Sequence, residues 1–330
     1  MNILVTGGAG YIGSHTVRAL LASDDFSPVI YDNLSTGHAE SAPEGVPLIR
    51  GDIHDTDAAA AAMREYDIQG IIHFAAFSLV GESMTDPAKY YENNVVGTFR
   101  LLQAMRKAGV HNIVFSSTAA VYGEPEECPI RESFPCRPTN VYGRTKLVIE
   151  NMMKDFTAAY GMHYAALRYF NAAGASSDGS IGEDHNPESH LIPLILKTAQ
   201  GVRDHIAIFG TDYPTADGTC IRDYVHVNDL ASAHILAMEY LLSGGESQAF
   251  NLGSQKGFSV REIIEAARQI TRVPFKVTEE TRRPGDPAVL IASSEKARQI
   301  LRWQPEHSSV EEIISSAWKW HQAHPHGYTR

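Results

Sequence analysis

The first 32 residues read MNILVTGGAGYIGSHTVRALLASDDFSPVIYD and decide the fold. Residues 2–5 form a short apolar run typical of a strand, and the glycine-rich turn that follows leads into a helical pattern that ends near Ala22. A second apolar run, residues 29–31, ends in Asp32. This order of strand, turn, helix and strand predicts the first unit of a doubly wound α/β sheet.

The turn fits the pattern G-x-G-x-x-G at Gly8, Gly10 and Gly13. Such glycines allow a tight turn and close approach of the backbone to a pyrophosphate, which the amides at the helix N-terminus then face. An isolated pattern of this kind often marks nothing more than a turn. Here Asp32 follows about twenty residues later, where a carboxylate binds a ribose 2′-hydroxyl and repels a 2′-phosphate. The sequence therefore predicts NAD rather than NADP.

Composition excludes several classes of protein. The chain has 330 residues, 43% of them hydrophobic, and a formal net charge of −11, which disfavours binding to nucleic acid or to anionic membranes. The longest apolar stretch, residues 68–81, is too short to span a bilayer. Because Met1 leads directly into the first strand, we expect no signal peptide and a cytoplasmic protein. Three cysteines without a C-x-x-C pair agree with a reducing compartment.

Histidines near the C-terminus and in the middle of the chain raise the question of a metal. His321, His324 and His326 lie beside Pro and Gly with no neighbouring carboxylate, which is typical of a solvated tail. His185 and His190 follow two acidic residues, but in a loop without helical register. We expect no metal.

Short β-type runs and longer helical patterns alternate up to about Asn171, after which the pattern loosens. This order predicts a Rossmann-like doubly wound parallel sheet in residues 1–175 and a smaller C-terminal α/β substrate-binding domain in residues 176–330, from which some segments return to the first domain. The expected strands are residues 71–75, 112–117 and 164–170, and the expected helices are residues 87–108, 142–160, 259–271 and 310–321.

Tyr142 and Lys146 are four residues apart on a helix that Thr139 or Asn140 can cap, so both side chains lie on one face. A phenol becomes a base at neutral pH if its pKa falls by about three units, or about 4 kcal/mol. An ammonium about 4 Å away supplies roughly that energy. Thr118 follows an apolar strand and can share the proton. Without further context, a tyrosine and a lysine at this spacing are an ordinary pair on a helix surface. Hydroxyl groups at the end of a strand can likewise do no more than cap the strand.

At these residues the chain resembles the extended short-chain dehydrogenase/reductase family, and within it the UDP-glucose 4-epimerases. The resemblance covers nearly the whole chain. The motifs that carry it are TGGAGYIGSH (6–15), DN (32–33), HFAA (73–76), YYENNVVGT (90–98), FSSTAAVYG (115–123), YGRTK (142–146), LRYFNAAGA (167–175), DGTCIRDYVHV (217–227) and RRPGD (282–286).

The resemblance implies an NAD-dependent isomerase that interconverts UDP-galactose and UDP-glucose at C4 through a transient 4-keto sugar and enzyme-held NADH. It also implies a homodimer formed through helices near residues 90–108 and 144–160. The implied catalytic residues are Tyr142, Lys146 and Thr118. The implied NAD-binding residues are Gly7, Gly10, Tyr11, Ile12, Gly13, Asp32, Asn33, Asp52, Ile53, Phe74, Ala75, Ala76, Asn93, Tyr142, Lys146 and Phe170. The implied substrate-binding residues are Thr118, Tyr142, Asn171, His190, Leu191, Ala207, Ile208, Phe209, Arg222, Arg283, Asp286 and Leu290.

Some of these assignments have alternatives. A plain turn at the end of a strand explains Asp52 and Ile53 nearly as well as contact with adenine does. Arg222, which with Arg283 matches a clamp on the diphosphate, can instead pair with its neighbour Asp223. Asp286 matches a ribose contact, and residues 207–209 fall where the family packs uracil.

The chain also departs from its relatives. Ala119 and Ala120 stand where relatives that eliminate water or carbon dioxide carry carboxylates, so elimination lacks an acid/base pair. Ser78 replaces a lysine on the NAD phosphates, Thr118 replaces a serine, and His190 replaces an asparagine that meets the substrate.

Leu290 occupies the position that gates the sugar pocket, and its intermediate size suggests that UDP-N-acetylglucosamine is also accepted. Two rival functions remain. One is a net NAD-dependent oxidoreductase, which would release NADH. The other is a catalytically silent NAD sensor, which would have no need of Tyr142 and Lys146.

Overall fold

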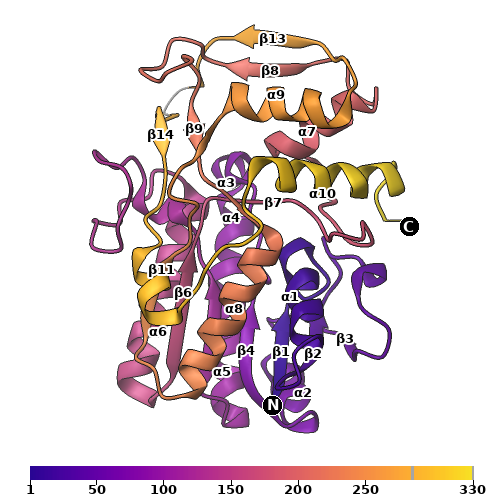
Figure 1. Ribbon diagram of the computed structural model, residues 1–330. Helices are drawn as coiled ribbons and strands as arrows, with labels where there is room; N and C mark the ends of the chain where they lie inside the picture. The colour runs from indigo at the N-terminus through magenta and orange to yellow at the C-terminus, as the bar shows by residue number, and fades with distance from the viewer. Residues whose placement is uncertain (284–285, 329–330) are drawn as a thin grey trace.

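A seven-stranded parallel sheet forms the larger part of the molecule in the computed structural model, which describes residues 1–283 and 286–328 (Figure 1). The strand order is β11-β6-β5-β4-β1-β2-β3, so the direction of winding reverses between β1 and β4. The predicted Rossmann-like doubly wound sheet is confirmed. The strands are β1 (Asn2–Thr6), β2 (Ser27–Asp32), β3 (Leu48–Arg50), β4 (Ile68–His73), β5 (Asn112–Ser116), β6 (His163–Arg168) and β11 (Gln248–Asn251).

Helices cover both faces of this sheet because its central strands are apolar on both sides. Along β1, Ile3 and Val5 pack into one core and Leu4 into the other. The first core is closed by α1 (Tyr11–Leu21) and α8 (Val227–Leu242), and the second by α2 (Thr56–Glu65), α5 (Gly97–Ala108) and α6 (Val141–Tyr160).

Two segments from the C-terminal half of the chain lie with this sheet. Strand β11 pairs in parallel with β6 at the sheet edge, and α8 packs against α1. The apolar side chains of α8 that enter the core include Leu230, Ala233 and Ala237. Chain order therefore does not separate the two layers of the molecule.

The expected helix of residues 87–108 is interrupted by a wider turn. It consists of α4 (Pro87–Tyr90), a π-helical turn (Tyr91–Val96) and α5. Pro87 begins α4, and the side chain of Asp86 caps it by accepting from the amide of Lys89. Such π-turns often occur at functional sites, and this one contains Asn93 and Asn94. The short α3 (Val80–Thr85) precedes it.

A smaller layer faces the carboxyl ends of the large sheet (Figure 1). Its core joins α7, α9 and α10 to β8 through Ile192, Ile208, Ile263 and Ile313. Its elements are α7 (Leu191–Ala199), α9 (Val260–Thr271), α10 (Val310–Ala323), the pair β8 (Ile206–Phe209) and β13 (Val277–Glu280), the three strands β12 (Phe258–Ser259), β9 (Ile221–Arg222) and β14 (Val289–Leu290), and the pair β7 (Asn171–Ala173) and β10 (Tyr224–His226).

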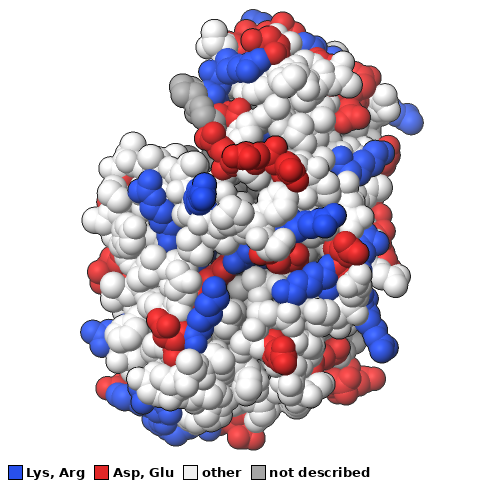
Figure 2. Space-filling model, turned by 90° about the vertical axis from the view of Figure 1, so that its left-hand side faces the viewer, with Lys and Arg blue, Asp and Glu red and all other residues white. Residues whose placement is uncertain are grey.

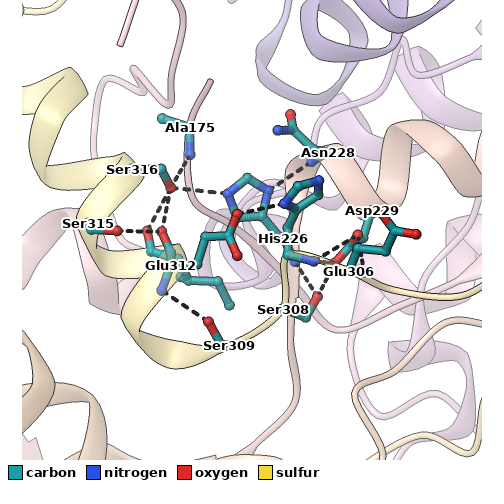
Figure 3. A network of polar contacts seen from close by, with 12 residues as sticks. Ala175, His226, Asn228, Asp229, Glu306, Ser308, Ser309, Glu312, Ser315 and Ser316 are labelled. Atoms are coloured by element: carbon teal, nitrogen blue, oxygen red, sulfur yellow. Dashed lines mark hydrogen bonds and ion pairs between the residues drawn. The ribbon is translucent and has the colours of Figure 1, made fainter. Parts of the chain in front are cut away.

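A buried polar network connects the two layers at the start of α8 (Figure 3). His226 accepts from the amide of Asn228 at 3.1 Å, so its other ring nitrogen carries the proton and donates to the hydroxyl of Ser316 in α10 at 3.1 Å. The carboxylate of Asp229 accepts from the amide of Glu306 at 2.8 Å and from the hydroxyl of Ser308 at 2.6 Å. These bonds fix α10 against the large sheet.

Charges of both signs are interspersed over the face shown in Figure 2, and acidic side chains gather where the surface is indented between the larger and smaller parts. Among the described residues, no helix combines the length and apolar character that crossing a membrane requires.

Acid should destabilise this fold through its buried histidines. Burial lowers their pKa values from 6.5 to about 3 or about 4, so below pH 6.5 the unfolded chain binds more protons than the folded one. Each such group then reduces the free energy of unfolding by about 1.4 kcal/mol per pH unit as pH falls from 6.5 towards the folded-state pKa. The histidines concerned are His15, His73, His226, His234 and His321.

Urea unfolding between pH 7 and pH 4.5 measures this slope. The variant His234→Gln should flatten it by about one proton's contribution, or about 1.4 kcal/mol per pH unit. The matched control is His163→Gln, at the exposed first position of β6, and should leave the slope unchanged. A wild-type slope that is flat below pH 6.5 would contradict the prediction.

Candidate active site

The glycine turn between β1 and α1 forms a cradle that has no room for side chains. Gly7 has a φ of +71°, and a Cβ there would lie 2.6 Å from the amide nitrogen of Ala75. A Cβ at Gly13 would overlap the carbonyl oxygen of Gly7. Only glycine allows both the left-handed backbone at the first position and the close packing of helix on turn at the second.

Helix α1 begins immediately after this cradle with free backbone donors. Gly10 is its N-cap and supplies no side-chain cap, so the amides of the first turn, which includes Tyr11, Ile12 and Gly13, remain for a ligand. The hydroxyl of Tyr11 donates to the carbonyl of Gly174 at 2.6 Å, which connects the turn to β7. The arrangement suits the phosphates of a dinucleotide.

Asp32 lies at the carboxyl end of β2 and is held by two backbone amides. Its carboxylate accepts from Ala9 at 2.9 Å and from Leu34 at 2.8 Å. It is only 7% exposed, and burial raises its pKa. The neighbouring Asn33 donates to the Asp52 carboxylate at 3.0 Å. A carboxylate fixed in this way beside the glycine cradle suits a ribose hydroxyl.

The remaining residues expected at the cofactor line the next loops. Ile53 is buried beneath Gly97 of α5, and Ala76 follows Ala75 after the end of β4. The ring of Phe74 packs on His234, with 4.6 Å between ring centroids. Asn93 donates to the side chain of Asn94, which in turn holds the backbone of Phe77, and Phe170 is half-buried beside Leu290 and Tyr122.

Tyr142, Lys146 and Thr118 meet where β5 ends and α6 begins. Asn140, one of the two residues predicted to cap α6, does so by accepting from the amide of Gly143 at 2.8 Å. The Thr118 hydroxyl accepts from the amide of Ala120 at 3.1 Å, and its proximity to the Tyr142 phenol opposes the rise in that phenol's pKa that burial causes. Thr118 thus lies near the phenol, and the proton relay between the two side chains stays a prediction.

The coupling between Tyr142 and Lys146 differs from the expectation. The ammonium of Lys146 donates to the carbonyl of Ser116 at 2.8 Å and lies 5.8 Å from the centroid of the phenol ring, rather than directly on the hydroxyl. Burial raises the pKa of Tyr142 to about 12 and lowers that of Lys146 to about 7. The protein's own groups therefore keep the phenol protonated at neutral pH.

Behind Lys146 lies an ion pair that sequence reasoning missed. Glu150, one helical turn further along α6, binds Arg168 of β6 by two hydrogen bonds, at 2.9 Å and 2.5 Å, and accepts from the hydroxyl of Ser117 at 2.6 Å. Arg168 also donates to the hydroxyl of Tyr122 at 2.7 Å. In the sequence, only the four-residue spacing between Lys146 and Glu150 pointed to this ion pair, because Arg168 lies on another element, β6.

The residues expected to bind a diphosphate and its nucleoside come together on the small strands. Arg222 of β9 forms an ion pair with Asp286. The alternative, an ion pair between Arg222 and its neighbour Asp223, is therefore wrong. Asp223 instead accepts from Ser254 and from the amide of Ala292.

Arg283 lies over the ring of Phe209 at 3.9 Å. Two residues of the RRPGD motif, Pro284 and Gly285, are outside the described residues.

Along β8, side chains alternate between the core and the surface. Ile208 is 2% exposed and packs into the core, so a ligand could contact only its backbone, whereas Ala207 and Phe209 are half-buried on the other side. Asn171 donates to the carbonyl of Asp223 at 2.9 Å. Leu290 pairs in register with Arg222 and reaches the cluster that contains Phe170.

His190 and Leu191 lie at the start of α7, where His190 is the N-cap residue. The imidazole of His190 contacts the carboxylates of Glu183 and Glu188, both at 2.9 Å. The acidic partner of this histidine at position 188 was not among the expected site residues.

Comparison with known proteins agrees with this geometry. The profile of the NAD dependent epimerase/dehydratase family matches residues 3–253. The chain belongs to this family. The UDP-glucose 4-epimerase of Halalkalibacterium halodurans is 56% identical over 329 residues, which cover 100% of this chain and 98% of that protein. The resemblance inferred from the motifs is confirmed.

Two solved members of the family extend the comparison to the fold. The UDP-glucose 4-epimerase of Brucella ovis in complex with NAD is 48% identical, with a TM-score of 0.94, over 96% of this chain and 97% of that one. The enzyme of Stenotrophomonas maltophila with bound NAD and formylated UDP-arabinopyranose is 41% identical, with a TM-score of 0.95, over 98% of this chain and 99% of that one.

Proposed function

We propose that this protein is a UDP-glucose 4-epimerase that interconverts UDP-galactose and UDP-glucose at C4 with NAD and without net redox change. The observation that carries the proposal is the proximity of Thr118, Tyr142 and Lys146 at the carboxyl end of β5, in the same sheet whose strand β1 leads into the glycine cradle. Family membership and the 56% identical relative support the same activity.

The residues of the cradle fit NAD. Gly7 and Gly13 form a tight turn that has no room for a Cβ, the first turn of α1 offers unpaired amides, and Asp32 presents a fixed carboxylate. When bound, NAD would remove hydrogen from C4 and return it, and its positive ring would lower the pKa of a nearby phenol. We propose the sixteen cofactor residues named from the resemblance as the lining of this site.

Tyr142 is the base that takes the proton from the C4 hydroxyl and gives it back. Thr118 lies near the phenol and can share that proton, and Lys146 adds positive charge that favours the phenolate. Ala119 and Ala120 supply no carboxylate, so these residues can move a proton at the hydroxyl but have no acid/base pair for elimination.

The nucleotide is held more firmly than the sugar. Arg222 and Arg283 offer guanidinium groups for the diphosphate. Asp286 offers a carboxylate for a ribose hydroxyl. Ala207 and Phe209 offer a surface for uracil. Weak contacts with the hexose are what a ketone needs in order to turn over before it is reduced from the other side. In this proposal residues 1–175 hold the cofactor, and most of residues 176–330 hold the nucleotide sugar.

The test is incubation of the purified protein with UDP-galactose without added NAD, while UDP-glucose and the absorbance of reduced nicotinamide are followed. We expect UDP-glucose to form without accumulation of NADH. NADH that accumulates only after NAD is added would identify a net dehydrogenase. Absence of turnover with retained NAD would identify a sensor.

Leu290 supports a wider substrate range as a second candidate. Its side chain is half-buried against the cluster that contains Ala119 and Tyr122, which follows the catalytic end of β5. The variant Leu290→Tyr would fill this space. We expect it to reduce kcat/KM for UDP-N-acetylglucosamine at least about tenfold, the equivalent of about 1.4 kcal/mol, with little change for UDP-glucose.

The control for this prediction is Leu290→Met, which nearly conserves volume. It should leave the ratio of kcat/KM values for the two substrates close to that of the wild-type protein. Equal loss for both substrates in the tyrosine variant would show that Leu290 does not discriminate between them.

We also infer a homodimer formed through α5 and α6, and a cytoplasmic location. These helices expose Phe99, Val148 and Tyr160, which are 37%, 37% and 45% exposed, and apolar side chains of this size on neighbouring helices favour association. Free thiols at all three cysteines support a reducing compartment. Sedimentation equilibrium at micromolar concentration tests the dimer, and a single species of one chain's mass would exclude it.

A further inference from the structure

Four side chains from the segment between β7 and α7 converge on one point. The Nδ1 atom of His190 lies 2.9 Å from a carboxylate oxygen of Glu183 and 2.9 Å from one of Glu188. The Nδ1 atom of His185 lies 3.1 Å from Glu183 and 3.8 Å from the other oxygen of Glu188. All four potential ligand atoms lie within 4.8 Å of one another. The loop therefore brings together two imidazole nitrogens and two carboxylates, although the sequence showed no helical spacing that would predict this.

The carboxylates of this cluster are buried while its two imidazoles are partly exposed, and its polar atoms are not all paired. The side chains of Glu183 and Glu188 are 7% and 4% exposed. One oxygen of Glu188 and Nδ1 of His185 are buried without a hydrogen-bond partner among the described residues. No Lys or Arg in the described part of the chain forms an ion pair with either carboxylate. Two buried negative charges thus lack a permanent cation, which is costly in a protein interior.

We propose that Glu183, His185, Glu188 and His190 bind one divalent transition-metal ion, with Zn²⁺ the best match. Zinc sits about 2.0–2.2 Å from imidazole nitrogen and carboxylate oxygen, so the edges of its tetrahedron measure about 3.3–3.5 Å. The four separations between imidazole nitrogens and carboxylate oxygens, 2.9, 2.9, 3.1 and 3.8 Å, lie around that value, and all four ligand atoms lie within 4.8 Å of one another. Two imidazoles exclude Mg²⁺ and Ca²⁺, which prefer oxygen ligands.

The position of the cluster indicates a structural role. Four protein ligands close a tetrahedral site, whereas a catalytic zinc keeps one position open. The ring of His185 meets Tyr11 of the glycine turn edge-on, with 6.3 Å between centroids, and His190 is the N-cap of α7, directly before Leu191. The metal would hold the start of α7 against the turn that we assign to NAD.

The competing description is an ion-pair cluster without metal, in which protons take the place of the cation. Although burial opposes it, the carboxylates of Glu183 and Glu188 raise the pKa of His190 to about 10. Both descriptions need positive charge at the same point. They differ in whether one metal per chain is bound and in which residues bind it, and both quantities can be measured without turnover.

The experiment uses the full chain, stripped with EDTA and titrated with Zn²⁺ against a chromophoric chelator, and separately loaded with Co²⁺. We expect one site per chain and the intense visible absorption of tetrahedral Co²⁺. His185→Gln and Glu188→Gln should each weaken Zn²⁺ binding at least about 100-fold, because loss of an outer partner alone costs about 10–100-fold. Thermal unfolding should shift upward with Zn²⁺ in the wild-type chain and not in these variants.

The control is the double variant His324→Ala/His326→Ala, which removes two of the three candidate histidines near the C-terminus. It should bind Zn²⁺ as the wild-type chain does. Less than a tenth of an equivalent of Zn²⁺, or Co²⁺ without tetrahedral bands, would establish the metal-free ion-pair cluster. Binding lost in the C-terminal variant and kept in His185→Gln would establish an adventitious surface site. Each outcome is independent of epimerase activity.

Discussion

Replacing Tyr142 with Phe should reduce kcat for UDP-galactose by about 10²–10⁴-fold while the chain still binds NAD. The substitution removes only the hydroxyl that exchanges the proton with the sugar. The ring remains packed at the start of α6, where the backbone amide of residue 142 still donates to the hydroxyl of Ser83 at 3.1 Å. Lys146 keeps its hydrogen bond to Ser116. Turnover and bound nucleotide, measured on the same preparation, separate loss of the base from loss of the cofactor.

The matched control is Tyr66→Phe. Tyr66 is the C-cap of α2 and precedes the amino end of β4. It therefore lies at the amino ends of the strands, whereas Thr118 follows the carboxyl end of β5. This variant should retain wild-type turnover. If Tyr142→Phe kept full activity, the phenol would not be the base and the proposed mechanism would fall.

Replacing Glu150 with Gln should lower the free energy of unfolding by about 3–5 kcal/mol, because it leaves the charge of Arg168 buried without a partner. The two side chains are 1% and 6% exposed, so water cannot replace the lost interaction. Urea unfolding at pH 7 measures the loss. Burial lowers the pKa of Lys146, and Glu150 opposes that shift, so Lys146 in the variant should lose its positive charge, and the variant its activity, at a lower pH on the alkaline side of the profile than the wild type.

The control is Asp57→Asn, which breaks an exposed ion pair with Lys107. This substitution should leave the urea midpoint unchanged, since solvent screens an exposed pair. Equal midpoints for Glu150→Gln and the wild type would show that the buried pair contributes nothing to stability.

Several features could be predicted from the sequence because they depend on neighbours along the chain. The glycine turn and Asp32 lie on one strand-helix-strand unit, whose geometry follows from backbone sterics and periodicity. Tyr142 and Lys146 lie on one helix face because of the helical repeat, and Asn140 caps that helix as one of two expected residues.

Contacts between distant segments could not be predicted in this way. Arg222 and Asp286 were both expected at the site, but their mutual ion pair joins β9 to a loop 64 residues away. The return of α8 and β11 to the large sheet depends on which apolar faces of that sheet are still uncovered. A pattern of neighbouring residues cannot predict this.

The sequence by itself determined the parallel doubly wound sheet, the cofactor cradle and the placement of Tyr142 and Lys146 on one helix face, because each depends on the pattern of neighbouring residues along the chain. The tertiary structure alone decided the charge states within the site. Burial raises the pKa of Tyr142 and lowers that of Lys146. Folding of the loop before α7 also brings Glu183, His185, Glu188 and His190 together around one point. Desolvation and convergence depend on the packing of whole layers, which exists only once the chain has folded.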